Sequence, residues 1–133
     1  MNLSQLVAAE GLNAITANLN GGSMTIYSGT QPASPETALS GNTALVAATF
    51  SGTAFNAPAF SSGKMTSSGA FTSGSYAPTA SGTATFARCT TSGGVAVADL
   101  TVGTSGTDVI VGNTNIQTGT NVSFSMTMSV PAA

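Results

Sequence analysis

From residue 23 onward, short runs rich in Thr, Val, Ile and Phe are interrupted about every 8–12 residues by Gly, Ser, Asn or Pro. This spacing is typical of an all-β sandwich or barrel, because each run is long enough for one strand and each interruption supplies a turn. We therefore expect a mainly β, antiparallel domain of the β-sandwich or jelly-roll type over residues 23–133. The pattern predicts strands near 23–28, 44–51, 54–60, 64–66, 82–91, 95–102, 108–112 and 121–130.

Two segments between these strands lack a strand pattern. Residues 29–42 contain two prolines and are predicted to form a long connection. Residues 61–81 are rich in Ser and Gly, so that composition alone is compatible with disorder. Met65, Phe71 and Tyr76 within this segment favour instead a loop that packs on the rest of the domain.

The segment before residue 23 has helical periodicity. We predict one short helix over residues 4–19, with Ser4 as its N-cap and Gly21-Gly22 after its end, within an N-terminal helical arm of residues 1–22. A helix this short needs a docking surface, which is either its own sheet or a neighbouring subunit. Its predicted apolar stripe consists of Leu6, Val7, Ala9, Leu12, Ile15 and Leu19.

The last predicted strand has the clearest alternation in the chain. Its apolar residues occupy every second position and its hydroxyl residues occupy the positions between them. Because side chains alternate across a strand, one face is apolar and the other carries only Ser and Thr. The apolar set is Val122, Phe124, Met126, Met128 and Val130.

A hairpin around Gly93-Gly94 brings the chain's single arginine to a partner. With these two glycines as the loop, Arg88 lies opposite Asp99 and shares a sheet face with Phe86 and Val97. A cross-strand ion pair on a solvated face is one interpretation. The other is that Phe86, Arg88, Val97 and Asp99 form a protein interface covered by another subunit.

Composition excludes several classes of function. Charged residues make up 5% of the chain, against about 25% in a typical soluble domain, and two cations are too few for a nucleic-acid surface. With no His and with Cys89 as the only thiol, we expect no transition-metal site, no His-activated nucleophile and no cofactor. Asp99 and Asp108 are the remaining candidates for paired carboxylates or a calcium site, but no pattern sets their separation. We expect no enzymatic activity and no membrane span.

Residues 21–34 resemble the segment GG-x-LRIY-x-GTQPAS, and residues 82–88 resemble the strand GTATxxR. Both motifs are found in a family of small virion structural proteins of tailed bacteriophages and prophages, which the chain resembles. The segment Thr101–Asp108 and the final strand ending in VPAA match in the same order. Phe86 stands where the family has Trp, and Met24-Thr25 replaces an apolar-Arg pair.

The resemblance implies a virion structural protein that is assembled in the host cytoplasm and has no catalytic residues. Our first expectation is a capsid decoration (cement) protein, a homo-oligomer that binds the major capsid protein rather than nucleic acid, a membrane or a small-molecule substrate. A tail or head–tail connector component is the alternative within this class. A small sugar-binding or adhesin module is the alternative outside it, and would have an exposed aromatic cleft.

Overall fold

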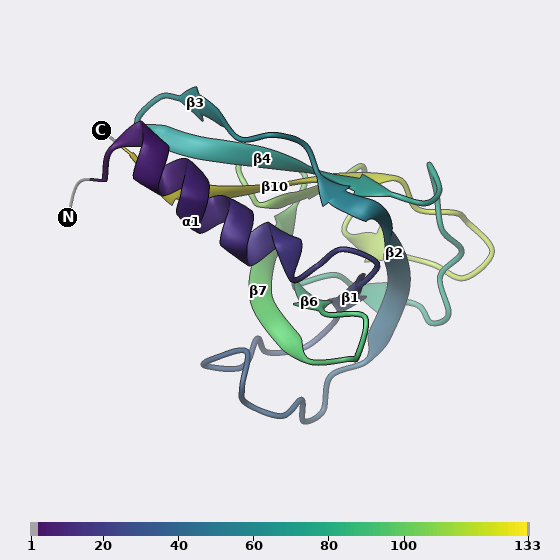
Figure 1. Ribbon diagram of the computed structural model, residues 1–133. Coiled ribbons are helices and arrows are strands. Elements are labelled where there is room, and N and C mark those ends of the chain that lie inside the picture. Colours follow the sequence, from purple (N-terminus) through teal and green to yellow (C-terminus); the bar gives the residue numbers. More distant parts are fainter. Residues whose placement is uncertain (1–2, 133) are drawn as a thin grey trace.

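The structure is a computed structural model that describes residues 3–132, and it is mainly β with one N-terminal helix (Figure 1). The first two residues of the predicted arm and Ala133 at the end of the predicted domain lie outside this range. The elements are α1 (Gln5–Ala17), β1 (Ser23–Tyr27), β2 (Ala44–Phe55), β3 (Ala59–Ser61), β4 (Lys64–Phe71), β5 (Gly82–Thr83), β6 (Phe86–Thr90), β7 (Ala96–Gly103), β8 (Val109–Val111), β9 (Asn115–Ile116) and β10 (Phe124–Pro131).

Seven strands close into a barrel rather than forming the two facing sheets of the predicted sandwich. The order is β10-β8-β7-β6-β1-β2-β4, and β4 pairs with β10 to complete the ring. All pairs are antiparallel except β7–β8, which is parallel. Strand spacing along the chain does not distinguish a barrel from a sandwich, because only the β4–β10 pairing closes the sheet. Strands β5 and β9 form a separate two-stranded pair.

Strand β4 lies in the segment predicted as a loop, and only its first three residues were expected to be a strand. It pairs with β2 and β3 on one side and with β10 on the other. Its inward positions include Ser67, which is buried, and Gly69, where a Cβ would lie 2.6 Å from Cγ of Met126. The strand lacks an apolar alternation because Met126 of the neighbouring strand β10 fills the space above Gly69.

Strand β2 is continuous over the position where the sequence predicts a break. Its pairing with β4 shifts between Phe50 and Phe55, which marks a bulge or irregularity. The end of the helical segment is tied to this irregular stretch: the amide of Ala54 donates to Oδ1 of Asn20 at 2.8 Å, and the amide of Gly21 donates to the carbonyl of Ser51 at 3.1 Å. The irregularity therefore provides the attachment point of the helix.

Helix α1 begins as predicted and packs on its own barrel. The Ser4 hydroxyl accepts a hydrogen bond from the amide of Val7 at 3.3 Å, as an N-cap does. The helix contacts β2, β4 and β10. The predicted stripe is partly wrong, because Leu6 is 72% exposed while Ala8, Leu12 and Thr16 are buried. The small side chains of Ala8 and Thr16, one turn on either side of Leu12, allow the helix to approach the barrel closely.

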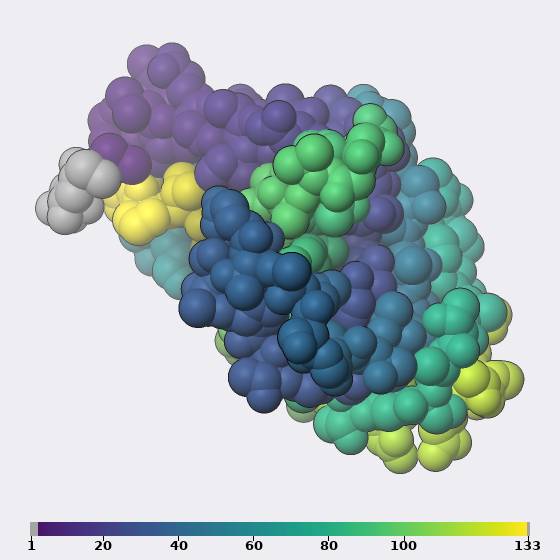
Figure 2. All heavy atoms as spheres, turned by 90° about the horizontal axis from the view of Figure 1, so that it is seen from below, coloured from purple at the N-terminus to yellow at the C-terminus, as the bar shows by residue number. Residues whose placement is uncertain are grey.

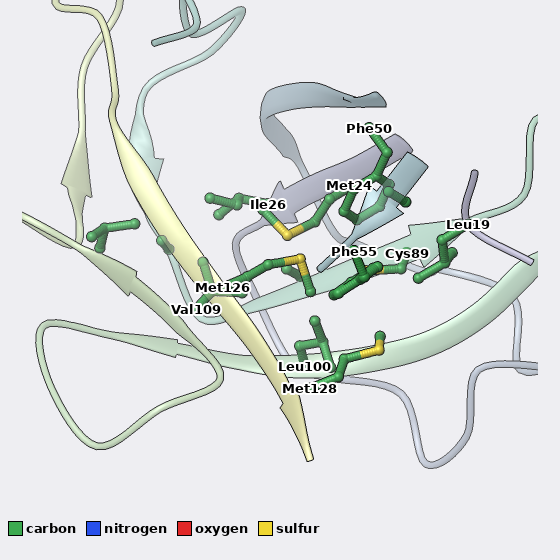
Figure 3. Packing of buried hydrophobic residues seen from close by; sticks show 14 of the residues in the cluster. Leu19, Met24, Ile26, Phe50, Phe55, Cys89, Leu100, Val109, Met126 and Met128 are labelled. Atoms are coloured by element: carbon green, nitrogen blue, oxygen red, sulfur yellow. The ribbon is translucent and has the colours of Figure 1, made fainter. Parts of the chain in front are cut away.

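The barrel and the helix share one core. Ala8, Leu12 and Leu19 belong to the same buried cluster as the strand residues, so the helix is not a separate arm in its packing. The accessible surface is 6642 Å², close to the roughly 6,300 Å² expected for a folded monomer of this mass. Figure 3 shows Met126 and Met128 of β10 among these core residues, as the alternation predicts.

Candidate functional site

The predicted pairing of Arg88 with Asp99 is confirmed, although the loop that produces it differs. Strands β6 and β7 pair Arg88 with Asp99 and Cys89 with Ala98. The turn spans residues 92–94, because the amide of Thr91 bonds to the carbonyl of Val95. The register shift beyond Cys89 places Val97 in a bulge. The longer loop and the bulge compensate for each other and restore the predicted register.

Arg88 and Asp99 form a buried bidentate pair. Nε of Arg88 lies 2.7 Å from Oδ1 of Asp99, and Nη2 lies 2.9 Å from Oδ2. The two side chains are 8% and 3% exposed. Hydrogen bonding to Asp99 raises the pKa of Arg88, while burial acts in the opposite direction. The arginine therefore stays charged, and its geometry is the strong planar form of a guanidinium–carboxylate contact.

Arg88 also binds the long connection predicted over residues 29–42. Its Nη1 donates to the carbonyl of Thr37 at 3.0 Å, and Nη2 lies 3.4 Å from the carbonyl of Ser34. We call residues 29–42 the clamped loop. Figure 2 shows it in blue over one face of the molecule. One guanidinium thus joins the sheet to the middle of this loop.

The two ends of the clamped loop are held together at its base. Nδ2 of Asn42 donates to the carbonyls of Ser28 and Thr30 at 2.9 and 3.0 Å. The hydroxyl of Thr85 donates to the carbonyl of Gly29 at 2.6 Å. Close ends and internal packing are the properties of an Ω-loop, a type of surface loop that frequently carries function. The chain therefore presents a long loop with a fixed base and a fixed centre.

The four residues predicted as an interface do not all share one environment. Phe86 is fully buried and stacks on Tyr27 with ring centroids 5.4 Å apart, and it lies two residues from Arg88 on the same strand. Val97, displaced by the bulge, is half-buried and packs against the main core cluster. Phe86, Arg88 and Asp99 are thus brought together, whereas the placement of Val97 beside them is wrong.

A single copy of the chain accounts for the burial of this pair. Arg88 is 7% exposed without any partner chain, and two of its hydrogen bonds go to the clamped loop. A neighbouring subunit is therefore not needed to keep the Arg88–Asp99 pair out of water. The surface left for a partner on this side is the outer side of the loop, where Gln31, Ala33 and Glu36 are exposed.

The other chemically active groups are dispersed. Oδ2 of Asp108 accepts from the amide and the hydroxyl of Thr101, both at 3.2 Å, while Asp99 is bound to Arg88. Burial raises the pKa of Cys89 to about 12, so this thiol is protonated at neutral pH. Among residues 3–132 no three His, Cys, Asp or Glu side chains cluster as metal ligands would.

Comparisons with protein-family models, with curated proteins and with solved structures found no match to this chain. In the part of the chain that the structure describes, no helix has the length and apolar character needed to cross a membrane.

The sequence analysis did not single out a concave region at residues 112–123. It is a cavity of about 430 Å³, within the range typical of small-molecule sites. A compositional signal marks it: four of the chain's twelve Asn and Gln residues fall within residues 113–121. Its lining residues are Gly112, Asn113, Asn115, Ile116, Gln117, Thr120, Asn121, Val122 and Ser123.

Proposed function

We propose that this chain is a structural subunit of a tailed-bacteriophage particle, and in the first place a capsid decoration protein that binds the major capsid protein as a homo-oligomer. The observation that carries the proposal is the nearly uncharged surface. Outside the buried Arg88–Asp99 pair, the charged side chains of the described residues are exposed Glu10, Glu36 and Lys64 and half-buried Asp108. A free soluble domain relies on many more charges for colloidal stability.

Exposed apolar side chains support the same assignment. Leu6 and Val95 are 72% and 66% exposed, and Val7 and Phe60 are 49% and 44% exposed. Hydroxyl groups and small apolar groups can be buried against another protein without the desolvation cost of charges. A repeated subunit that is covered on assembly fits this surface better than a protein that acts alone in solution.

The clamped loop suits a role in assembly. Its base and centre are fixed before any partner binds, so association would require little additional ordering of the backbone. The resemblance to phage virion proteins includes Gly29–Ser34, the first part of this loop. A tail or head–tail connector position uses the same properties and is the second candidate in this class.

A sugar-binding or adhesin module as the main role receives less support. That interpretation expects an exposed aromatic cleft, but Phe71, Tyr76 and Phe124 pack on one another and against the core.

The test is electron microscopy of phage particles produced with and without the gene. Decoration of the head predicts extra density on the capsid shell that is lost in the deletion, together with heads that break at a lower temperature. Density confined to the tail or the connector would support the second candidate. Absence of the protein from particles that were produced with the gene would refute a virion role.

A further inference from the structure

We propose that the cavity at residues 112–123 binds a neutral saccharide. This site is additional to the proposed virion role and rests on different residues. The first argument is its chemistry: the lining includes the carboxamides of Asn113, Asn115, Gln117 and Asn121, and no charged side chain. A carboxamide presents N–H donors and a carbonyl acceptor in one plane, which matches sugar hydroxyls that both donate and accept.

Most of these carboxamides are free to bind. Oδ1 of Asn113 accepts from the amide of Asn115 at 2.9 Å. The side chains of Asn115, Gln117 and Asn121 make no hydrogen bond to another residue in the range 3–132. Asn20 and Asn42, in other parts of the chain, bind backbone groups of adjoining segments. Those two carboxamides hold the fold together, whereas the three in the cavity do not.

The cavity also has an apolar part. Ile116 is 2% exposed and Val122 is half-buried, so both are anchored in the domain while they line the cavity. Binding sites for small molecules combine apolar contact with a few convergent polar groups. The C–H face of a pyranose ring can lie against the half-buried Val122 side chain while its hydroxyls reach the carboxamides.

Hydrogen bonds to neighbouring segments of the chain fix the walls of the cavity. Ile116 pairs with Gly82 across β5 and β9, and the amide of Thr118 donates to the hydroxyl of Ser81 at 3.0 Å. On the other side, Tyr76 and Val122 exchange two backbone hydrogen bonds of 3.0 and 2.8 Å. Figure 2 shows the teal and yellow-green segments adjoining at one end of the molecule. Because these hydrogen bonds hold the backbone of the walls, binding requires little ordering of it.

The absence of charge among the lining residues selects the ligand class. A phosphate or carboxylate ligand would need a cationic partner, and an amine would need an anionic one. Neutral saccharides can form hydrogen bonds with the lining carboxamides and need neither a cationic nor an anionic partner. A peptide could also bind carboxamides through its amides, but it has no dense array of hydroxyls, and the lining residues supply side-chain groups rather than a free strand edge.

The experiment is a titration of the isotopically labelled full chain, followed by amide chemical shifts in NMR. The probes are methyl α-glucoside, methyl β-galactoside and N-acetylglucosamine, and the linear trisaccharides maltotriose and chitotriose. We expect saturable shifts, centred on residues 112–123, for at least one neutral saccharide at millimolar concentration. Tighter binding of a trisaccharide would identify the source as a glycan chain, and equal binding would identify it as a free sugar.

Two variants test the residues. Gln117→Ala and Asn121→Ala should each weaken binding about three- to tenfold, the range for one lost hydrogen bond. Both side chains are exposed, so the melting temperature should stay unchanged. The matched control is Gln31→Ala, an exposed carboxamide in the clamped loop, which should leave the affinity unchanged.

Three results would overturn the proposal. The first is the absence of a saturable shift with every neutral saccharide, and the second is binding that both cavity variants leave unchanged. The third is tighter binding of glucose 6-phosphate, glucosamine or a trialanine amide than of any neutral saccharide, which would assign the cavity to another ligand class. None of these results bears on particle assembly, which is tested separately by microscopy.

Discussion

Replacing Arg88 by Ala should destabilise the isolated chain strongly. The substitution removes two hydrogen bonds to a carboxylate whose side chain is 3% exposed, and two more to carbonyls of the clamped loop. An unpaired charge left behind in such a site costs about 3–5 kcal/mol. That is a fifth or more of the roughly 5–15 kcal/mol that stabilises a typical domain. For a chain of 133 residues the melting temperature should fall by about 10–18 °C.

The assay is urea unfolding and thermal unfolding followed by circular dichroism. Lys64→Ala, which removes the other cation of the chain from an exposed position, is the matched control and should change the free energy of unfolding by less than about 0.5 kcal/mol. The double variant Arg88→Leu/Asp99→Leu should be much more stable than Arg88→Ala, because it leaves no buried charge without a partner.

Two results would refute this reasoning. A loss below about 1 kcal/mol for Arg88→Ala would show that the pair behaves as a solvated surface pair. A double variant as unstable as the sum of its single substitutions would show that packing, and not charge compensation, is responsible.

Further substitutions test the core, the glycines and the loop. The pKa of Cys89 is about 9 in the unfolded chain and about 12 when the thiol is buried. The contribution of the buried thiol to the free energy of unfolding is therefore complete below pH 9, and it falls by up to about 1.4 kcal/mol per pH unit above pH 9. Cys89→Ala should show a smaller loss of stability at alkaline pH in urea unfolding. Leu12→Ala should cost about 2–5 kcal/mol in the same assay, and an unchanged midpoint would mean that the helix does not contribute to the core. Gly22→Ala should cost about 3 kcal/mol, because its Cβ would clash with the carbonyl oxygen of Thr90, whereas Gly11→Ala has open space and should stabilise the helix by about 1 kcal/mol. A Gly22→Ala variant as stable as the parent chain would contradict the packing at Gly22. Arg88→Ala should also speed native-state cleavage after Glu36 in the clamped loop by a glutamyl protease, and equal rates would show that Arg88 does not hold the loop.

Local sequence patterns were sufficient for several elements. The mainly β class follows from the spacing of turn residues, and the inward face of β10 follows from its alternation of apolar and hydroxyl residues. The N-cap at Ser4 follows from a hydroxyl residue placed before a helical pattern. The Arg88–Asp99 pairing was also predicted, because the positions of the hairpin glycines restrict the register to a few alternatives.

Other features depend on groups that are distant in sequence. The sequence of β4 does not show its inward face, because Ser67 and Gly69 are small where Met126 from another strand fills the interior. The buried side of α1 is centred on Leu12 because the barrel accepts small neighbours there, and helical periodicity alone does not predict that. The cavity at residues 112–123 likewise requires segments that pair with β5 and with Tyr76.

The candidate interface shows the same division. The sequence predicted that Arg88 meets Asp99 and that polar and apolar residues are mixed on this face of the sheet. Only the tertiary structure shows that the clamped loop returns over this face and supplies the carbonyls of Ser34 and Thr37. Periodicity encodes which side of a strand is buried, because that is a local property of the backbone. Which segment covers that buried side depends on long-range contacts, and the spacing of residues along one strand does not predict those contacts.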